Sequence, residues 1–326
     1  MIARAFLAAL LLGAGCDAAP GLRVRGAGEP AIQPKPLHIA EESEIAPFKE
    51  ATDPLPPPTP IPFTREVFPI ANFTSLPPYE GAIAASRRRA RAAGGEEEEE
   101  EDESLLPRDI NGADDRKLYT GPAELPYSAM GRLLSRNGFV CSATLVGPRH
   151  VASARHCYQA GVGLRFQPLY DRGERLDGAF VTAAISKKGE VAQMCDHKDD
   201  WVVFVIDQRL GQQYGWLGFR TLNSDIAGKS SWWNFGYPTD LGSGERPYYQ
   251  GPFAADLLPT LQCQNGGPLT SDMDAASGQS GGPLWVNQPD GAYMVGMHSA
   301  SQPGFSVAAH GSEWFDALSY ARANYP

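Results

Sequence analysis

The sequence predicts an all-β protein, and two observations lead to that prediction. Beyond residue 110 the chain consists of short runs rich in β-branched and aromatic residues, separated by Gly, Pro, Asn and Asp. Strands bounded by such turn signals, with no helical segments between them, indicate antiparallel barrels or sandwiches rather than βα units. All six tryptophans also lie in this part of the chain, and its length suits one large all-β domain or two small barrels.

Nine runs are candidate strands, and one segment is a candidate helix. The expected strands are 139–146, 150–153, 163–166, 179–185, 201–206, 232–235, 282–286, 292–298 and 305–309. Turn signals such as Gly147-Pro148 bound several of them. The helix is expected at the C-terminus, with Ser312 as its cap. Its apolar face would carry Trp314, Phe315, Leu318 and Ala321 or Arg322.

The first 109 residues differ from the rest in composition. They carry 15 of the 28 prolines and a net charge of 11 − 18 = −7, out of −10 for the whole chain. Residues 1–19 combine a basic start, an apolar run and small residues, which is typical of a secretory signal peptide. Cys16 also stands in a loose match to a bacterial lipoprotein signal, so lipid anchoring at Cys16 is a minor alternative.

Residues 20–109 are expected to be a disordered propeptide or linker. Their proline cluster at 54–60 and their acidic run at 96–103 cannot bury enough apolar surface to offset chain entropy. An activating protease could cut at the basic cluster that ends at Arg91, or at the Arg108-Asp109 junction. The predicted domains are 1–19, 20–109 and 110–326, the last being the folded domain.

Composition and cysteine spacing exclude several classes of function. No basic stripe is present that could neutralise phosphates, so no nucleic-acid partner is expected. No apolar run approaches the ~20 residues of a membrane span, and no phosphate loop or cofactor fingerprint is present, so we expect no cofactor. Without Cys16, four cysteines remain, and their long spacings disfavour a metal site. In a secreted chain four cysteines can close two disulfides in any of three pairings.

Three segments carry the residues that nucleophilic catalysis needs. His156 stands directly before a cysteine, Asp200 precedes a fully apolar run, and Ser280 lies among glycines in Gly278-Gln279-Ser280-Gly281-Gly282. A serine hydroxyl attacks well once an imidazole removes its proton, and the imidazole needs a carboxylate to hold its tautomer. The order His, Asp, Ser therefore indicates a catalytic triad. The Gly-x-Ser-x-Gly pattern also fits an α/β-hydrolase elbow, but that fold places the acid and the histidine after the serine.

The domain resembles chymotrypsin-fold, trypsin-like (S1-type) serine endopeptidases, and most closely their glutamyl endopeptidase branch. The resemblance covers about residues 110–320 and rests on four stretches in the same order: 110–116, 125–133, 234–238 and 278–281. It implies two β-barrels meeting at a cleft and a polypeptide substrate. It also implies His156 as general base, Asp200 as orienting acid and Ser280 as nucleophile.

The same resemblance implies further site residues. Gly278 and Ser280 would supply the oxyanion N–H groups. A Cys141–Cys157 disulfide flanks the histidine in the family pattern, and elimination leaves Cys195–Cys263 as the second bridge.

Three positions complicate the assignment. Arg155 replaces the small residue that the family has before the histidine, which favours a rival function, a catalytically silent protease-like binding module. Asp199 competes with Asp200, and we prefer Asp200 because it abuts the apolar strand. Gln279 stands where pancreatic-type enzymes carry the aspartate that receives a new N-terminal amine, so that ion pair is not expected here.

Substrate preference depends on a few residues near the serine. Asp274 stands where trypsin-like enzymes place the acid that selects Arg or Lys, although the glutamyl branch also tends to have Asp there. In that branch a histidine on the following strand receives the substrate carboxylate, and His298-Ser299 would supply it. We therefore expect Glu or Asp before the scissile bond, with His298, Asp274 and Ser299 binding substrate. Self-cleavage after Asp109 would then be possible, and cleavage after basic residues is the alternative.

Overall fold

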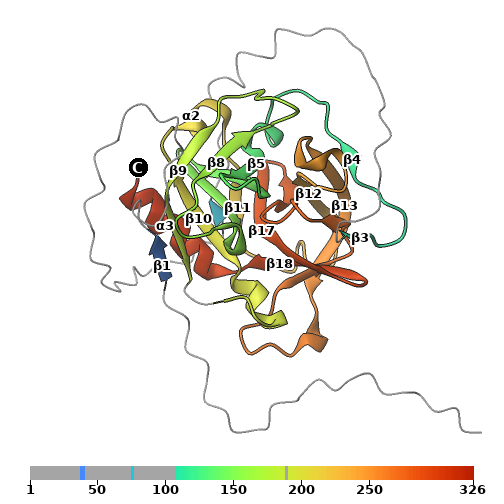
Figure 1. Ribbon diagram of the computed structural model, residues 1–326. Helices are drawn as coiled ribbons and strands as arrows, with labels where there is room; N and C mark the ends of the chain where they lie inside the picture. The colour runs from blue at the N-terminus through green and yellow to red at the C-terminus, as the bar shows by residue number, and fades with distance from the viewer. Residues whose placement is uncertain (1–36, 41–74, 77–107, 188–189) are drawn as a thin grey trace, which may run out of the picture. The chain divides into compact units, whose positions relative to one another are not determined.

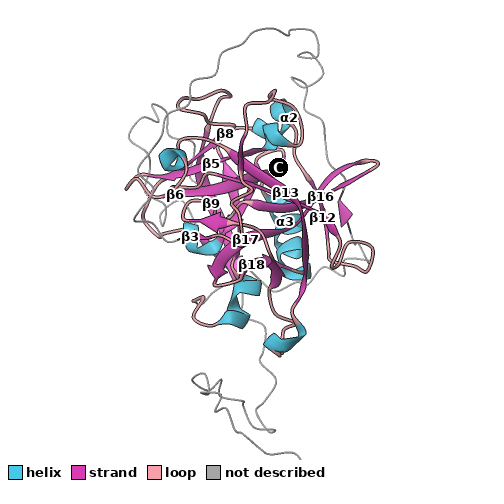
Figure 2. Ribbon diagram, turned by 90° about the vertical axis from the view of Figure 1, so that its right-hand side faces the viewer, coloured by secondary structure: helices cyan, strands magenta, loops and turns pink. Residues whose placement is uncertain are grey.

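The computed structural model describes residues 37–40, 75–76, 108–187 and 190–326. The predicted signal peptide, Cys16, the cluster at Arg91 and most of the segment 20–109 lie outside the described residues. Strands are the main regular structure of the described part, and apart from the last helix the helical turns are short (Figure 2). Among the described helices, none has the length and apolar character that a membrane crossing requires.

The first barrel is one closed antiparallel sheet of six strands (Figure 1). Its strands are β5 (Met130–Ser135), β6 (Val140–Gly147), β7 (His150–Ala154), β8 (Leu164–Pro168), β9 (Ala179–Lys187) and β10 (Trp201–Ile206). The sheet runs β9-β10-β7-β6-β5-β8 and closes where β8 pairs with β9. All six residues of β10 are buried, because the helix at the C-terminus covers the side of the strand that does not face the barrel interior.

The second barrel repeats this architecture with six other strands. They are β12 (Ser230–Gly236), β13 (Tyr248–Leu257), β14 (Leu269–Ser271), β16 (Pro283–Gln288), β17 (Gly291–Gln302) and β18 (Phe305–His310). The sheet runs β16-β12-β13-β14-β18-β17 and closes where β16 pairs with β17. Two further short strands pair with strands of this barrel. β4 (Lys117–Leu118) is antiparallel to β13, and β11 (Gly218–Arg220) is parallel to β17.

Three short strands come from the part of the chain that was expected to be a disordered leader. β1 (Leu37–Ala40) pairs with β9, and β2 (Ser75–Leu76) pairs with β11. β3 (Arg108–Asp109) pairs with β15 (Ala275–Ala276), just before the predicted nucleophile. These stretches differ from a leader without regular structure, and the last of them contains the predicted processing junction.

The terminal helix is α3 (Ser312–Asn324), which packs on β9 and β10 (Figure 1). As predicted, it buries one face that includes Trp314, Phe315 and Leu318. Gly311, and not Ser312, is the residue before its first turn, and no side chain caps it. The structure therefore confirms the all-β class, the two barrels and the helix, while the cap residue was predicted wrongly.

Several elements were missing from the sequence prediction. They include β5, β11, β13, β14, the two-residue strands β4 and β15, and the short helix α2 (Leu210–Tyr214). In β13 the Gly251-Pro252 pair resembles a turn, yet it lies inside the strand, where the register between β12 and β13 is irregular. Local patterns miss such strands because pairing with neighbours, and not their own residue preferences, holds them in place.

Candidate active site

His156 is placed by the end of β7 and by a disulfide. A single 3₁₀ turn, Arg155–Cys157, follows β7, and Cys157 is joined to Cys141 on β6 with a Cα–Cα distance of 6.2 Å. On the other side, Ala154 is paired with Trp201 at the start of β10. His156 therefore emerges beside the residue that precedes β10, which is Asp200.

Asp200 holds His156 by two contacts, one with the imidazole and one with the backbone. His156 Nδ1 lies 2.7 Å from Asp200 Oδ2, and the backbone N–H of His156 donates to Oδ1 at 3.0 Å. Asp200 is fully buried, whereas 35% of the His156 side chain is exposed. Burial alone would raise the pKa of Asp200, but hydrogen bonds from His156 and Ser299 lower it below its ordinary value. An ionised carboxylate only accepts hydrogen bonds, so Nδ1 carries the proton and Nε2 is free to accept one.

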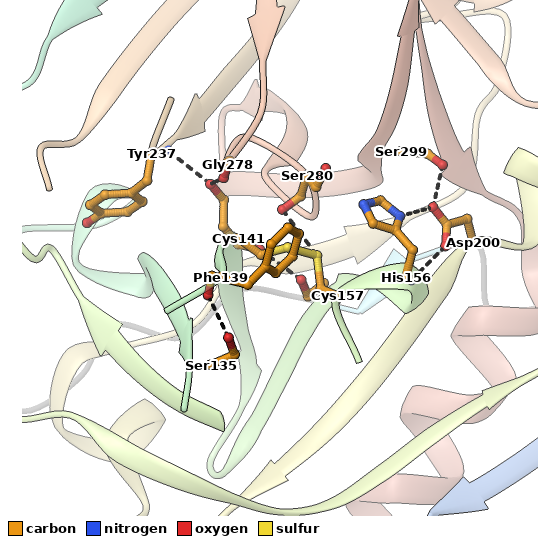
Figure 3. The surroundings of a disulfide bond; sticks show 12 residues. Ser135, Phe139, Cys141, His156, Cys157, Asp200, Tyr237, Gly278, Ser280 and Ser299 are labelled. Carbon is orange, nitrogen blue, oxygen red and sulfur yellow. Dashed lines mark hydrogen bonds and ion pairs between the residues drawn. A yellow bond between two sulfur atoms is a disulfide. The ribbon is translucent and has the colours of Figure 1, made fainter. Parts of the chain in front are cut away.

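Ser280 lies in the turn between β15 and β16, on the other side of the imidazole. Figure 3 shows the His156 ring between Asp200 and Ser280. The carbonyl of Ser280 accepts the N–H of Ser142 on β6 at 2.8 Å, which ties the turn to the first barrel. No hydrogen bond joins the Ser280 hydroxyl to another described residue. This is a common state for a nucleophile in a site without substrate.

Two N–H groups of the turn are left without a partner. The N–H groups of Gln279, Gly281 and Gly282 donate to backbone carbonyls at 3.1, 2.8 and 2.9 Å. Those of Gly278 and Ser280 have no acceptor in the part of the chain that the structure describes. Unused donors beside a serine can stabilise an oxyanion that forms during attack on a carbonyl.

Glycine is required at two positions of this turn. Gly278 has φ +90°, and a Cβ there would lie 2.2 Å from the carbonyl oxygen of Tyr237. Gly281 has φ +80°, and a Cβ would lie 2.1 Å from Ser153 Oγ. The turn approaches both neighbours so closely that no side chain fits.

The side chains of Asp199, the competing acid, and of Arg155 both bond Lys187 and not His156. Asp199 forms an ion pair with Lys187 at 3.0 Å and has no hydrogen bond or ion pair with His156. Arg155 is buried, and its Nη1 donates to the carbonyl of Lys187 at 2.9 Å. Its guanidinium therefore has a partner that is not part of the His156–Asp200 pair, which removes the observation that favoured a silent module.

Asp274 does not present its carboxylate to substrate. It is 2% exposed, and its oxygens accept the backbone N–H groups of Asn111 at 2.7 Å and Asp115 at 2.9 Å. The expectation that Asp274 binds substrate is therefore corrected: its carboxylate anchors the first residues of the folded domain.

The hydroxyl of Ser299, which was expected to bind substrate, instead bonds Asp200 and His197. It donates to Asp200 Oδ2, and its oxygen lies 2.7 Å from His197 Nδ1 (Figure 3 shows the Ser299–Asp200 contact). Because the single O–H is given to Asp200, the Ser299 oxygen accepts from Nδ1–H of His197. The side chain of Ser299 supports the acid and is not directed at substrate. His197 was not predicted from the sequence, since nothing local links it to a serine 102 residues later.

His298 lies on β17 and is 3% exposed. Burial, together with repulsion from His156 and His197, lowers its pKa to about 3, so the imidazole is neutral at pH 7. Its Nδ1 is buried without a hydrogen-bond partner among the described residues. A buried nitrogen without a partner is uncommon and leaves a ring able to bond an incoming polar group.

Both predicted cysteine pairs are joined in the structure. Cys195, which precedes Asp200, is bonded to Cys263 with a Cα–Cα distance of 5.5 Å. The sulfur atoms of Cys141 and Cys157 lie near a ring nitrogen of His156, within 4.8 Å, a spacing that a metal ion could use. Both sulfurs belong to a disulfide, so neither offers the thiolate that a metal would need.

The chain is similar to known proteins over most of its folded domain. The trypsin family model matches residues 120–310. A glutamyl endopeptidase of Bacillus licheniformis is 23% identical over 231 residues, which cover 66% of this chain and 64% of that protein. The chain thus spans slightly less than two thirds of that relative.

Solved structures show the same fold. A Glu endopeptidase in complex with MPD has a TM-score of 0.55 and 18% identity, over 66% of this chain and 99% of the other. The protease Anisep from Arthrobacter nicotinovorans has a TM-score of 0.50 and 20% identity, over 64% and 98%.

Proposed function

Because the chain belongs to the trypsin family, we propose that it is a secreted serine endopeptidase with His156, Asp200 and Ser280 as its triad. The observation that carries the proposal is the His156 ring, bonded to Asp200 at 2.7 Å with Ser280 on its opposite side (Figure 3). The exposed edge of the ring and the half-buried serine leave room for a polypeptide carbonyl.

The chemistry follows from these positions. Ser280 Oγ attacks the scissile carbonyl carbon while His156 Nε2 takes the hydroxyl proton, and Asp200 stabilises the imidazolium. The N–H groups of Gly278 and Ser280 bond the oxyanion, each contributing roughly 3 kcal/mol. His156 then protonates the leaving nitrogen, the C–N bond breaks, and an acyl ester remains on Ser280. A water molecule attacks that ester after giving its proton to His156, and the proton returns to Ser280 as the acid product leaves.

Fluorophosphonate labelling tests the proposed nucleophile. The folded protein should bind one equivalent at Ser280 and lose peptidase activity. Ser280→Ala should fold normally, take up no label and lose at least ~10⁴-fold in kcat. A folded wild-type protein that neither takes up label nor cleaves peptides would overturn the proposal and leave the silent binding module.

The proposed enzyme prefers Glu or Asp before the scissile bond. The relative named glutamyl endopeptidase supports this preference, and so does the carboxylate of Asp274, which is occupied by backbone N–H groups. Neutral His298 can donate a hydrogen bond to a substrate carboxylate, and the arriving anion raises the pKa of the ring and strengthens the contact.

Peptides that differ only in Glu, Gln or Arg at this position test the preference. We expect the Glu peptide to be cleaved fastest, and His298→Ala to raise KM for Glu while acylation by a small reactive ester changes little. Faster cleavage after Arg that His298→Ala leaves unchanged would contradict the preference and leave the triad assignment intact.

Secretion and processing complete the proposal. Residues 1–19 act as the signal peptide, with lipid attachment at Cys16 as the minor alternative, and two disulfides suit an oxidising compartment. A protease, this enzyme itself or another, releases the domain at Arg91 or near Arg108 and Asp109. N-terminal sequencing of the protein recovered from the culture medium identifies the cut, and a first residue within 1–19 would contradict it.

A further inference from the structure

Gln279, directly before the proposed nucleophile, is held by a residue from the start of the domain. It is 1% exposed, and its Oε1 accepts the N–H of Ala276 at 2.9 Å and Nη1 of Arg116 at 2.8 Å. Its Nε2 donates to Asn234 Oδ1 at 3.3 Å and to the carbonyl of Asp274 at 3.4 Å. The side chain is therefore fully engaged, and its orientation constrains the backbone that carries the next residue.

Arg116 uses every one of its donors in this cluster. Its Nε and Nη2 donate to Asp114 at 3.0 and 2.7 Å, and its Nη1 and Nη2 donate to Asp240 at 3.0 and 2.7 Å. The remaining N–H of Nη1 goes to Gln279. Its side chain is 1% exposed, and although burial disfavours the charge, the two carboxylates raise the pKa of Arg116 above its ordinary value. The guanidinium is a permanent charge with one allowed orientation.

Asp240, which is bonded to Arg116, is also connected to the turn that contains Ser280. Asp240 follows Thr239, whose backbone N–H and hydroxyl both donate to the carbonyl of Ser277, at 2.8 and 3.1 Å. Ser277 precedes Gly278, one of the two residues with an unused N–H group. Arg116 thus supports the turn from both sides, through Gln279 and through the loop that contains Asp240.

On these contacts we infer that Arg116 is a positioning residue for the oxyanion turn. It supplies, from within the chain, a cation to the place where pancreatic-type enzymes use a new amino terminus, and glutamine replaces the aspartate that would receive that amine. The backbone of Asn111 and Asp115, bound by Asp274, fixes the segment that presents Arg116. The inference rests on the proposed function, because the turn matters only if it stabilises an oxyanion.

Arg132 provides a matched control. It is a buried arginine on β5 of the first barrel, with Nε donating to Gln167 at 3.0 Å and an ion pair to Glu245, which lies between β12 and β13 of the second barrel. We expect Arg116→Met to lower kcat and the rate of fluorophosphonate labelling about 10–100-fold, with KM changed less than about 3-fold. Arg132→Met should leave kcat within about 3-fold, even where its loss of thermal stability is as large.

Gln279→Met removes the same contact and keeps both ion pairs of Arg116, so it replaces Arg116→Met if that variant does not fold. Because the two residues act through one bond, the double variant should be no slower than the slower single variant. Multiplying effects, or an Arg116→Met protein that is labelled at the wild-type rate, would overturn the inference and leave the triad standing. Failure of the wild-type protein to react would instead overturn the proposed function.

Discussion

The two barrels hold their parts of the site in different ways. In the first barrel His156 follows β7 and Asp200 precedes β10. These two strands are paired, with Ala154 opposite Trp201, so the strand ladder places the two residues side by side. In the second barrel Ser280 lies in a turn whose shape depends on side chains, above all Gln279 and its partner Arg116. A backbone ladder tolerates many substitutions, whereas a turn held by side chains depends on each of them. We therefore expect remote mutations to reach the nucleophile more readily than the acid–base pair.

The largest expected effect separates two adjacent carboxylates in the first barrel. Asp200→Asn should lower kcat about 10⁴-fold, because an amide at this position favours the wrong imidazole tautomer. Asp199→Asn, which disturbs only the ion pair with Lys187, should lower kcat less than about 3-fold. Steady-state kinetics on one peptide substrate measures both. Equal losses would remove the acid assignment.

Removing each disulfide compares a bridge within the first barrel with a bridge between the barrels. Cys141→Ala with Cys157→Ala opens a separation of 16 residues, and Cys195→Ala with Cys263→Ala one of 68. The chain-entropy account gives losses of about 3 and about 4 kcal/mol in the free energy of unfolding. Urea unfolding measures the loss.

Activity should follow the opposite order. The first bridge flanks His156, so its removal should reduce kcat more than removal of the second at equal folded fraction. A larger loss of kcat without Cys195–Cys263 would show that the junction between the barrels, and not the histidine turn, limits the geometry.

Acid should destabilise the fold through buried histidines. Burial lowers the pKa of His150 and His310 to about 4 and that of His298 to about 3, from ordinary values of 6.5. As pH falls from 6.5 towards 4, the unfolded chain binds protons that the folded chain refuses. The free energy of unfolding should therefore fall by up to about 1.4 kcal/mol per pH unit for each histidine.

A variant isolates one of these protons. His310→Gln keeps a donor for the carbonyl of Gly267, now bonded at 2.9 Å, but does not titrate. We expect its free energy of unfolding, measured by urea at pH 4.5, 5.5 and 6.5, to depend on pH less steeply than that of the wild type. The difference in slope should correspond to up to one proton fewer bound on unfolding. An unchanged slope would show that His310 is protonated in the folded state.

The smallest expected effect crosses from one barrel to the other. Ser299 on β17 donates to Asp200, so Ser299→Ala should raise the pKa of Asp200 and lower kcat about 10-fold with KM little changed. The acid limb of the pH–rate profile should move to higher pH. Ser301→Ala on the same strand, whose hydroxyl contacts Ser306, serves as the control.

The sequence allowed prediction of what local patterns encode. Short runs rich in β-branched and aromatic residues, bounded by turn signals, located most barrel strands. The local sequence around His156, Asp200 and Ser280 identified the three candidate catalytic side chains, which the structure brings to one place. The roles of Asp274, Ser299 and Arg116 could not be predicted in this way. Their roles depend on partners far away in the chain, 163 residues for the Arg116–Gln279 contact, and no local signal reports such a pair.

That separation also has a consequence in time. Arg116 and Asn111 emerge from the ribosome long before Gln279 and Asp274, their partners 163 residues later. At ordinary rates of synthesis the delay is roughly 10–30 s. Throughout that interval Arg116 lacks its partner, because the turn that contains Gln279 has not yet been synthesised. A protease assembled in this order has no formed nucleophile turn until Gln279 has been made, so it gains the ability to cut only after most of the folded domain has been synthesised.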